Sequence, residues 1–382
     1  MCSRHRYLFL ITVMVVATGF AEAAGIDYLE TPSYQTDRAP QGILLDIVNS
    51  GKHLVAVGER GYILYSSDLG KNWQQGSVPV YVTLTAVFFI TPDVGWAVGH
   101  EGVILHTSDA GKTWIKQLDG YQINQQILKL ARQRVQTQLQ KLETLTDETQ
   151  REEVTFQLEE ASYALEEALE DEAAGPAKPL LDVWFFNKNK GYAIGAYGIF
   201  LQTSNGGRDW ELISDRLDNP EGFHLNSITG SESGQVFIAG EAGSIHKSND
   251  NGRNWIRLGS PYEGSYFGLL NYGQSLFVFG LRGNVFRTDN KGESWQIVRM
   301  NNPVTLSGGV VSNTGKIVLV GNAGHIEYSD NKGASFNYFS SPAQSSLTAA
   351  VQVSSHEFLA VGANGIQKIT IPAPEEVRVD VE

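Results

Sequence analysis

The side chains with the clearest chemical pattern are an Asp or Asn repeated in the motif S-x-D-x-G-x-x-W, the Asp-box. The six copies place this residue at Asp68, Asp109, Asn205, Asp250, Asn290 and Asn331. An Asp or Asn at such a position accepts backbone N–H groups and caps a tight turn. The glycine two residues later supplies a positive φ, and the aromatic residue packs its ring between sheets. The spacing therefore predicts structural turns.

Metal and thiol chemistry find little support in the sequence. The segments 289–292 and 330–333 have some resemblance to calcium loops, but they lack the alternating oxygen ligands of an EF-hand. Cys2 is the only cysteine, so a processed chain would have no disulfide and no cysteine site. We expect no metal and no cofactor.

The first residues have the pattern of an export signal. Basic Arg4 and Arg6 precede an uncharged apolar stretch over 7–20, and Ala21 and Ala23 suit a signal peptidase. We therefore predict a signal peptide over 1–23, with an uncleaved anchor as the alternative. Its removal takes two positive charges and one negative charge, which changes the net charge from −13 to −14. This acidity argues against nucleic acid and anionic membrane surfaces as partners.

Seven Gly-x-x-Gly segments, each between two apolar runs, define a longer repeat. Their first glycines are Gly58, Gly99, Gly195, Gly240, Gly280, Gly321 and Gly362. The successive spacings are 41, 96, 45, 40, 41 and 41 residues, and the 96 is one period of 41 with an insertion of 55. A period near 40 with several short strands is typical of a β-propeller. We predict an all-β, seven-bladed propeller over residues 24–371.

Each unit is expected to have four strands, named a to d from the inside outward. Gly-x-x-Gly is then the turn between strands b and c, and the Asp-box is the turn between c and d. The last unit has no Asp-box and reaches Pro372, where a C-terminal tail over 372–382 begins. We predict that residues 26–34 form its fourth strand and close the ring.

The inserted segment 121–175 is predicted to be an α-helical hairpin between blades 2 and 3. It has no glycine or proline before Gly175, and it is rich in good helix formers. Asp147 and Gln150 can cap a second, acidic helix, and Gly175 with Pro176 can end it. A purely solvated hairpin remains an alternative.

The hairpin and the Gly-x-x-Gly turns are expected to share one face, because d–a connections and b–c turns emerge on the same side of a propeller. We predict that this face binds a partner, because variable polar residues on a rigid frame form binding surfaces in repeat proteins. The candidate partner-binding residues are Arg60, His100, Glu101, Tyr197, Glu241, Arg282, Asn322 and Asn364.

Units of period 41 with A-V-G-x-x-G and an Asp-box, in a secreted ring, resemble photosystem II assembly factors of the Ycf48/Hcf136 type. The resemblance covers nearly all of the chain after 1–23 except the insertion. It implies a non-enzymatic assembly factor that binds newly made reaction-centre protein in the thylakoid lumen. Periplasmic relatives often encoded beside RND-type exporters imply service to another membrane complex. The hairpin and the acidic charge favour such a bacterial relative.

The expected partner is therefore a membrane protein complex, either photosystem-like or an RND-type exporter. After signal cleavage no further segment is apolar enough to insert into a membrane. The alternative is a glycoside hydrolase, because sialidases and some β-glucanases also carry Asp-boxes. A sialidase needs three arginines around the substrate carboxylate. Only Arg38 with Pro40 faintly matches that pattern, so we predict no enzyme activity.

Overall fold

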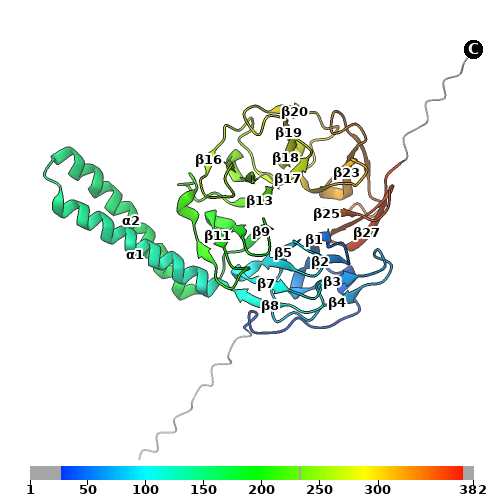
Figure 1. The fold of residues 1–382 in the computed structure, drawn as a ribbon, viewed down its shortest axis with the longest axis horizontal. Helices are drawn as coiled ribbons and strands as arrows, with labels where there is room; N and C mark the ends of the chain where they lie inside the picture. The colour runs from blue at the N-terminus through cyan, green and yellow to red at the C-terminus, as the bar shows by residue number, and fades with distance from the viewer. Residues whose placement is uncertain (1–26, 232–233, 373–382) are drawn as a thin grey trace, which may run out of the picture.

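The computed structural model describes residues 27–231 and 234–372 and shows seven antiparallel sheets arranged as a ring of blades (Figure 1). The first strand of each blade contacts the first strands of both neighbouring blades, and β1 contacts β25 to close the ring. The seven-bladed propeller predicted from the repeats is therefore confirmed. In the described ranges, no helix has the length and apolar character needed to span a bilayer.

Six sheets have four strands and the last has three. Blades 1 and 2 comprise β1 (Leu44–Asn49), β2 (Leu54–Gly58), β3 (Ile63–Ser66), β4 (Gln74–Gln75), β5 (Leu84–Phe89), β6 (Gly95–Gly99), β7 (Ile104–Thr107) and β8 (Ile115–Leu118). Blades 3 and 4 comprise β9 (Leu180–Phe185), β10 (Gly191–Gly195), β11 (Phe200–Thr203), β12 (Glu211–Leu212), β13 (Leu225–Gly230), β14 (Val236–Gly240), β15 (Ile245–Ser248) and β16 (Ile256–Arg257). Blades 5 to 7 comprise β17 (Tyr266–Tyr272), β18 (Ser275–Gly280), β19 (Val285–Thr288), β20 (Gln296–Val298), β21 (Leu306–Val311), β22 (Ile317–Gly321), β23 (His325–Ser329), β24 (Asn337–Ser340), β25 (Leu347–Gln352), β26 (Glu357–Gly362) and β27 (Gly365–Thr370).

Short 3-10 helices form most of the b–c turns. They are η2 (Glu59–Gly61), η3 (His100–Gly102), η4 (Ala196–Gly198), η6 (Glu241–Gly243), η7 (Leu281–Gly283) and η8 (Asn322–Gly324). Two others, η1 (Ala39–Gln41) and η5 (Ser214–Arg216), lie in connections.

The hydrophobic core lies between the blades. Each Asp-box aromatic packs against the preceding blade as well as its own, as Trp114 does beside Val55 and Ile63 of blade 1. Trp73 packs in the same way against blade 7. The apolar clusters therefore join neighbouring blades around the ring and hold the turns of each face in fixed relative positions.

The predicted closure by residues 26–34 is wrong for the part that the structure describes. Residues 27–34 form no strand, and their backbone bonds go to the blade 1–2 connection, where Ser33 donates to the Val78 carbonyl at 3.0 Å. Leu29 is buried in the cluster between those blades. Because its backbone and its apolar side chain are engaged there, this segment does not reach β27.

The insertion is a helical hairpin, as predicted, formed by α1 (Gly120–Thr144) and α2 (Glu148–Ala174). Asp119 and Gln122 form a capping box at the start of α1, and Asp147 accepts the Gln150 N–H at the start of α2. Gly175, with φ of 92°, ends α2. The hairpin extends away from the ring between blades 2 and 3 (Figure 1).

Candidate partner-binding surface

The six Asp-box side chains cap their turns in the same way. Asp68 accepts the Asn72 N–H at 2.9 Å, and Asn205 accepts the Asp209 N–H at 3.0 Å. Asp109, Asp250, Asn290 and Asn331 each accept the N–H four residues on, at 2.9 to 3.0 Å. Backbone and side-chain bonds from Asn72 lower the pKa of Asp68 to about 2. These side chains therefore serve as structural caps of their turns.

The glycines of the Gly-x-x-Gly turns are required by close backbone contacts. A Cβ on Gly58 would lie 2.1 Å from the Ile43 carbonyl at the entry to its own blade. Gly61, with φ of 70°, faces the Val80 carbonyl of the connection to the next blade. The first contact recurs at the other six turns, whereas the second, to a backbone carbonyl, recurs at Gly243, Gly283 and Gly365, and Pro40 supplies it at Gly365. Each turn therefore presents its variable residues from a rigid position.

The structure distributes the predicted partner-binding residues around the rim of one face. Six of them are exposed and Glu101 and Glu241 are half-buried; the exposed ones are Arg60, His100, Tyr197, Arg282, Asn322 and Asn364. Only those of blades 2 to 4 lie near the hairpin, as described below. Arg60, Arg282, Asn322 and Asn364 stand on separate turns of other blades.

A chain of contacts joins the turns of blades 4 and 3 to the hairpin. Glu241 accepts the His224 N–H at 3.2 Å, and the His224 ring lies 5.1 Å from the Tyr197 ring. Lys178 places its ammonium 5.5 Å from the centre of the Tyr197 ring and pairs with Asp171 of α2. Tyr197 and Glu241, two of the predicted partner-binding residues, thus belong to one continuous chain of polar and aromatic contacts.

A groove of about 300 Å3 lies where this chain of contacts meets the hairpin. Apolar side chains of both parts line it, among them Leu130, Ile199 and Leu212, and so does Tyr197. Arg134, Glu167 and Asp215 add charges of both signs. The groove thus combines apolar side chains with charges of both signs, a mixture that a peptide segment can match.

A second depression, about 360 Å3, lies on the other side of the hairpin base. Glu101 and Asp27 line it together with Tyr121 and Pro176. Desolvation, with the Asp27 charge adding to it, raises the pKa of Glu101. The hairpin base is therefore flanked by acidic groups on the blade 2 side and mixed charges on the blade 3 side.

The hairpin is anchored to the propeller at its base. Ile123 is buried in the cluster between blades 2 and 3, and Gln126 bonds both the Trp210 carbonyl and the Leu212 N–H. Farther out, α1 carries four basic side chains and one acidic, whereas α2 carries ten acidic and one basic. The two helices thus present opposite charge to the solvent.

Sequence reasoning missed Lys178, His224 and Arg134 as members of this surface. Lys178 and His224 precede the first strands of blades 3 and 4, in connections that the strand order places on the same face as the turns. That order could have identified them. Arg134 could not be placed, because the sequence does not fix how the hairpin leans on the ring.

Two carboxylates on innermost strands are the strongest candidates for acid–base chemistry. Desolvation raises the pKa of Asp46 to about 6 and that of Asp182 to about 7. Asp46 accepts the Ile47 and Val87 N–H groups, and Asp182 accepts those of Val183 and Ile228. Because each carboxylate links its strand to a neighbouring blade, we interpret them as structural. In the described part of the chain, no group of three or more acidic, His or Cys side chains could hold a metal.

A sequence model of the family described as photosynthesis system II assembly factor YCF48 matches residues 31–128 and 168–328. The chain belongs to this family. The internal part left out, 129–167, is most of the hairpin, and the match ends at 328, within β23. The family pattern therefore covers most of blades 1 to 6.

Individual Ycf48 proteins resemble the chain in sequence and in fold. The photosystem II assembly lipoprotein Ycf48 of Synechococcus sp. (strain CC9902) is 33% identical over 123 residues, which is 30% of this chain and only 35% of that relative. A solved structure titled YCF48 bound to D1 peptide has a TM-score of 0.59 at 15% identity and covers 91% of this chain and 99% of that chain. YCF48 from Cyanidioschyzon merolae has a TM-score of 0.57 at 16% identity and covers 87% and 96%.

Proposed function

We propose that this protein is a non-enzymatic scaffold that binds a segment of a membrane protein during assembly of its complex. The observation that carries the proposal is the groove in which the hairpin, Tyr197 and Lys178 meet on the Gly-x-x-Gly face. Membership of an assembly-factor family supports it. The related fold solved with a D1 peptide supports a peptide as the ligand.

The site of action is proposed to be the periplasm, or the thylakoid lumen in a photosynthetic cell. The predicted signal at 1–23, which lies outside the described residues, and the lipoprotein name of the Synechococcus relative support export. The partner is then a membrane complex, photosystem-like or an RND-type exporter, contacted from that side. Such a partner is consistent with the acidic surface, which disfavours nucleic acid.

The experiment is a pull-down from solubilised membranes with full-length protein and with Tyr197→Ala. Tyr338→Ala is the matched control, because both tyrosines are exposed and lie against a histidine ring, His224 and His325 respectively. Tyr338 lies on β24 of blade 6, away from the hairpin. We expect recovery of a membrane protein to fall for Tyr197→Ala only.

A third variant removes residues 136–163 and joins the helices by a short glycine loop. It keeps the base contacts of Ile123 and Gln126 but loses the outer, charged part of the hairpin. We expect weaker recovery, and a weaker salt dependence of what remains, since exposed charges act over about a Debye length. Equal recovery by all variants would contradict the proposed surface. Turnover of a sialoside or β-glucan substrate would contradict the non-enzymatic assignment.

A further inference from the structure

Two aromatic side chains of the hairpin are exposed on one face of α2. Phe156 is 61% exposed and Tyr163 is 66% exposed. They are seven residues apart, which is about two helical turns, so they lie on the same face of the helix. The buried residues of α2, which are Val154, Ala161 and Ala168, lie on the opposite face toward α1. The two rings are therefore on the side of α2 that faces away from the rest of the hairpin.

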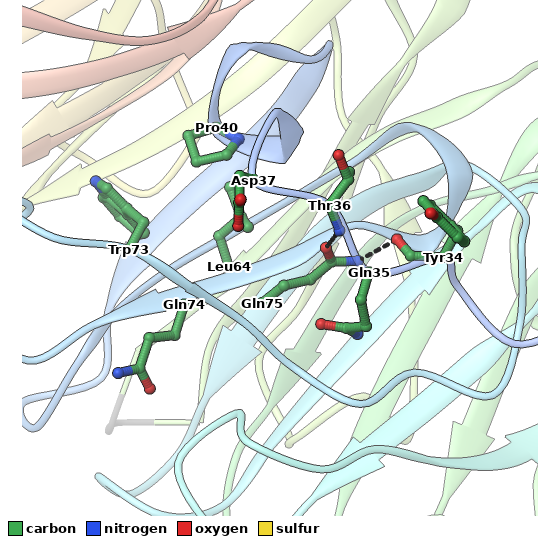
Figure 2. Close-up of a pocket in the computed structure, with 9 residues that line it drawn as sticks. All are labelled: Tyr34, Gln35, Thr36, Asp37, Pro40, Leu64, Trp73, Gln74 and Gln75. Carbon is green, nitrogen blue, oxygen red and sulfur yellow. Dashed lines mark hydrogen bonds between the residues drawn. The ribbon is translucent and has the colours of Figure 1, made fainter.

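The exposed aromatic side chains of the ring and of the segment before it, by contrast, have close neighbours. Three of them lie beside another aromatic or histidine ring, namely Tyr28, Tyr197 and Tyr338. Figure 2 shows Tyr34 at the edge of a cavity of about 680 Å3, where its carbonyl accepts a hydrogen bond from the Gln75 side chain. In the part of the chain that the structure describes, neither Phe156 nor Tyr163 contacts another ring. Exposed apolar groups of this kind mark interaction surfaces.

Glutamate side chains surround the two rings. Four of them lie one turn before or after a ring, and they are Glu152, Glu159, Glu160 and Glu167. All four are exposed. The ion pair of α2 within the described ranges joins Asp171 to Lys178, so none of the four glutamates is neutralised by such a pair. We call Phe156, Tyr163 and these four glutamates the outer stripe.

The outer stripe can recognise a partner only through side chains. Within a helix the backbone N–H and C=O groups bond each other, so α2 offers no edge to a β-strand. A second helix can carry apolar side chains at the same spacing, about 10 Å along its axis, and pack them against Phe156 and Tyr163. Lysine or arginine side chains beside those apolar residues meet the glutamates and can lie over the aromatic faces.

Charge and shape argue against two other occupants. Uncompensated glutamates repel the headgroups of anionic lipids. Two outer stripes facing each other would bring like charges together, because α2 has ten acidic side chains and one basic. The α1 helix of a second copy has the opposite charge, but beyond its base it offers Leu139 as its one large exposed apolar side chain. It therefore cannot match a pair of rings two turns apart.

The outer stripe continues the groove beside Tyr197 outward along α2. Glu167 lies one turn from Tyr163 and also lines that groove. We propose that the outer stripe binds an amphipathic helix of the partner protein that carries lysine or arginine beside its apolar face. This rests on the proposed function, because it adds a second contact for the same partner. The two contacts can be tested separately, since the groove is lined by Tyr197 and not by Phe156 or Tyr163.

The test measures the affinity of the full chain for a labelled synthetic peptide of leucine and lysine in an amphipathic helical pattern, by fluorescence anisotropy. The double variant Phe156→Ala with Tyr163→Ala removes both rings. We expect its dissociation constant to be about tenfold higher or more, because a few central aromatic side chains carry most of the binding energy of such contacts. The matched control, Leu139→Ala with Leu169→Ala, removes two other exposed apolar side chains of the hairpin and should change it by less than about twofold. Alanine favours helix, and circular dichroism checks that both variants stay helical.

A peptide of leucine and glutamate in the same pattern should not bind, because its charge has the sign of the outer stripe. Equal affinity of the unchanged chain and the Phe156 and Tyr163 variant would overturn the proposal, and so would binding of the glutamate peptide. Binding to phosphatidylglycerol vesicles that this variant loses would assign the outer stripe to a membrane, and a dimer that it loses would assign it to a second copy. Either result overturns the proposal. A negative peptide result leaves the Tyr197 experiment in place, and the reverse holds as well.

Discussion

At the residue scale, backbone conformation explains most of the geometry that recurs from turn to turn. The second variable residue of six Gly-x-x-Gly turns has a positive φ, from 50° at Ala242 to 59° at Arg282. The residue before the Asp-box glycine has one too, for example 64° at Ala110. The sequence predicted the glycines but not these neighbours, because only glycine identifies a left-handed position by its type. The surrounding contacts must compensate this strain.

The Asp-box cap can be tested at Asp109. Replacement by Ala removes the acceptor for the Lys112 and Thr113 N–H groups, and we expect a loss of about 0.5–2 kcal/mol in the free energy of unfolding. Asp109→Asn is the control, since three of the six boxes carry Asn in the same geometry. Chemical denaturation measures both. A similar loss in the two variants would show that charge, and not capping, stabilises the turn.

Asp182 should make stability depend on pH. Its pKa rises from 3.8 to about 7 in the folded chain, mainly by desolvation, so the folded state binds the proton more tightly. Its contribution is present below pH 4 and is lost as the pH rises to about 7. Histidines with lowered pKa values, such as His246, act in the opposite direction.

The comparison with Asp182→Asn therefore isolates the carboxyl group. We expect the stability of this variant relative to the unchanged chain to rise between pH 4 and pH 7 and to level off above. Urea unfolding at several pH values measures this difference. A difference that does not vary with pH would show that Asp182 is ionised in the folded protein throughout the range.

At the element scale, the strands and the hairpin could be predicted well from the sequence, and the N-terminal segment could not. Seven repeats and six Asp-boxes fix the strand order, and a long segment free of glycine and proline fixes the helices. The segment before β1 has a strand-like length, but length does not say which edge it meets. Its place is determined by Leu29 packing between blades 1 and 2, a tertiary contact with no repeating pattern.

The base of the hairpin should be part of the folded core, and its outer half should not. Ile123→Ala should destabilise the propeller by about 2–5 kcal/mol, because a buried side chain leaves a cavity. Leu139→Ala, at an exposed position of α1, should change stability by less than about 0.5 kcal/mol. Thermal unfolding measures both variants. An equally small loss of stability in both variants would mean that the hairpin base contributes little to the core of the ring.

At the scale of the whole molecule, the ring holds the turns of the Gly-x-x-Gly face in fixed positions. Inter-blade clusters fix the turns of blades 2, 3 and 4 relative to each other, and the hairpin adds one wall to them. The sequence placed Tyr197 and Glu241 on turns near the hairpin, but it could not predict the groove, because the groove depends on the angle of the hairpin. All eight candidates stay predictions as contact residues, and Arg60, Arg282, Asn322 and Asn364 lie away from the groove.

The most direct test of the central claim is site-specific photocrosslinking on native membranes. A benzophenone amino acid replaces Tyr197 beside the groove or, in the control, Tyr338 on the far blade. We predict a covalent adduct with a membrane protein from position 197 and none from position 338. Adducts of equal yield from both positions, or adducts from position 338 alone, would contradict the assignment of the hairpin groove as the partner-binding surface.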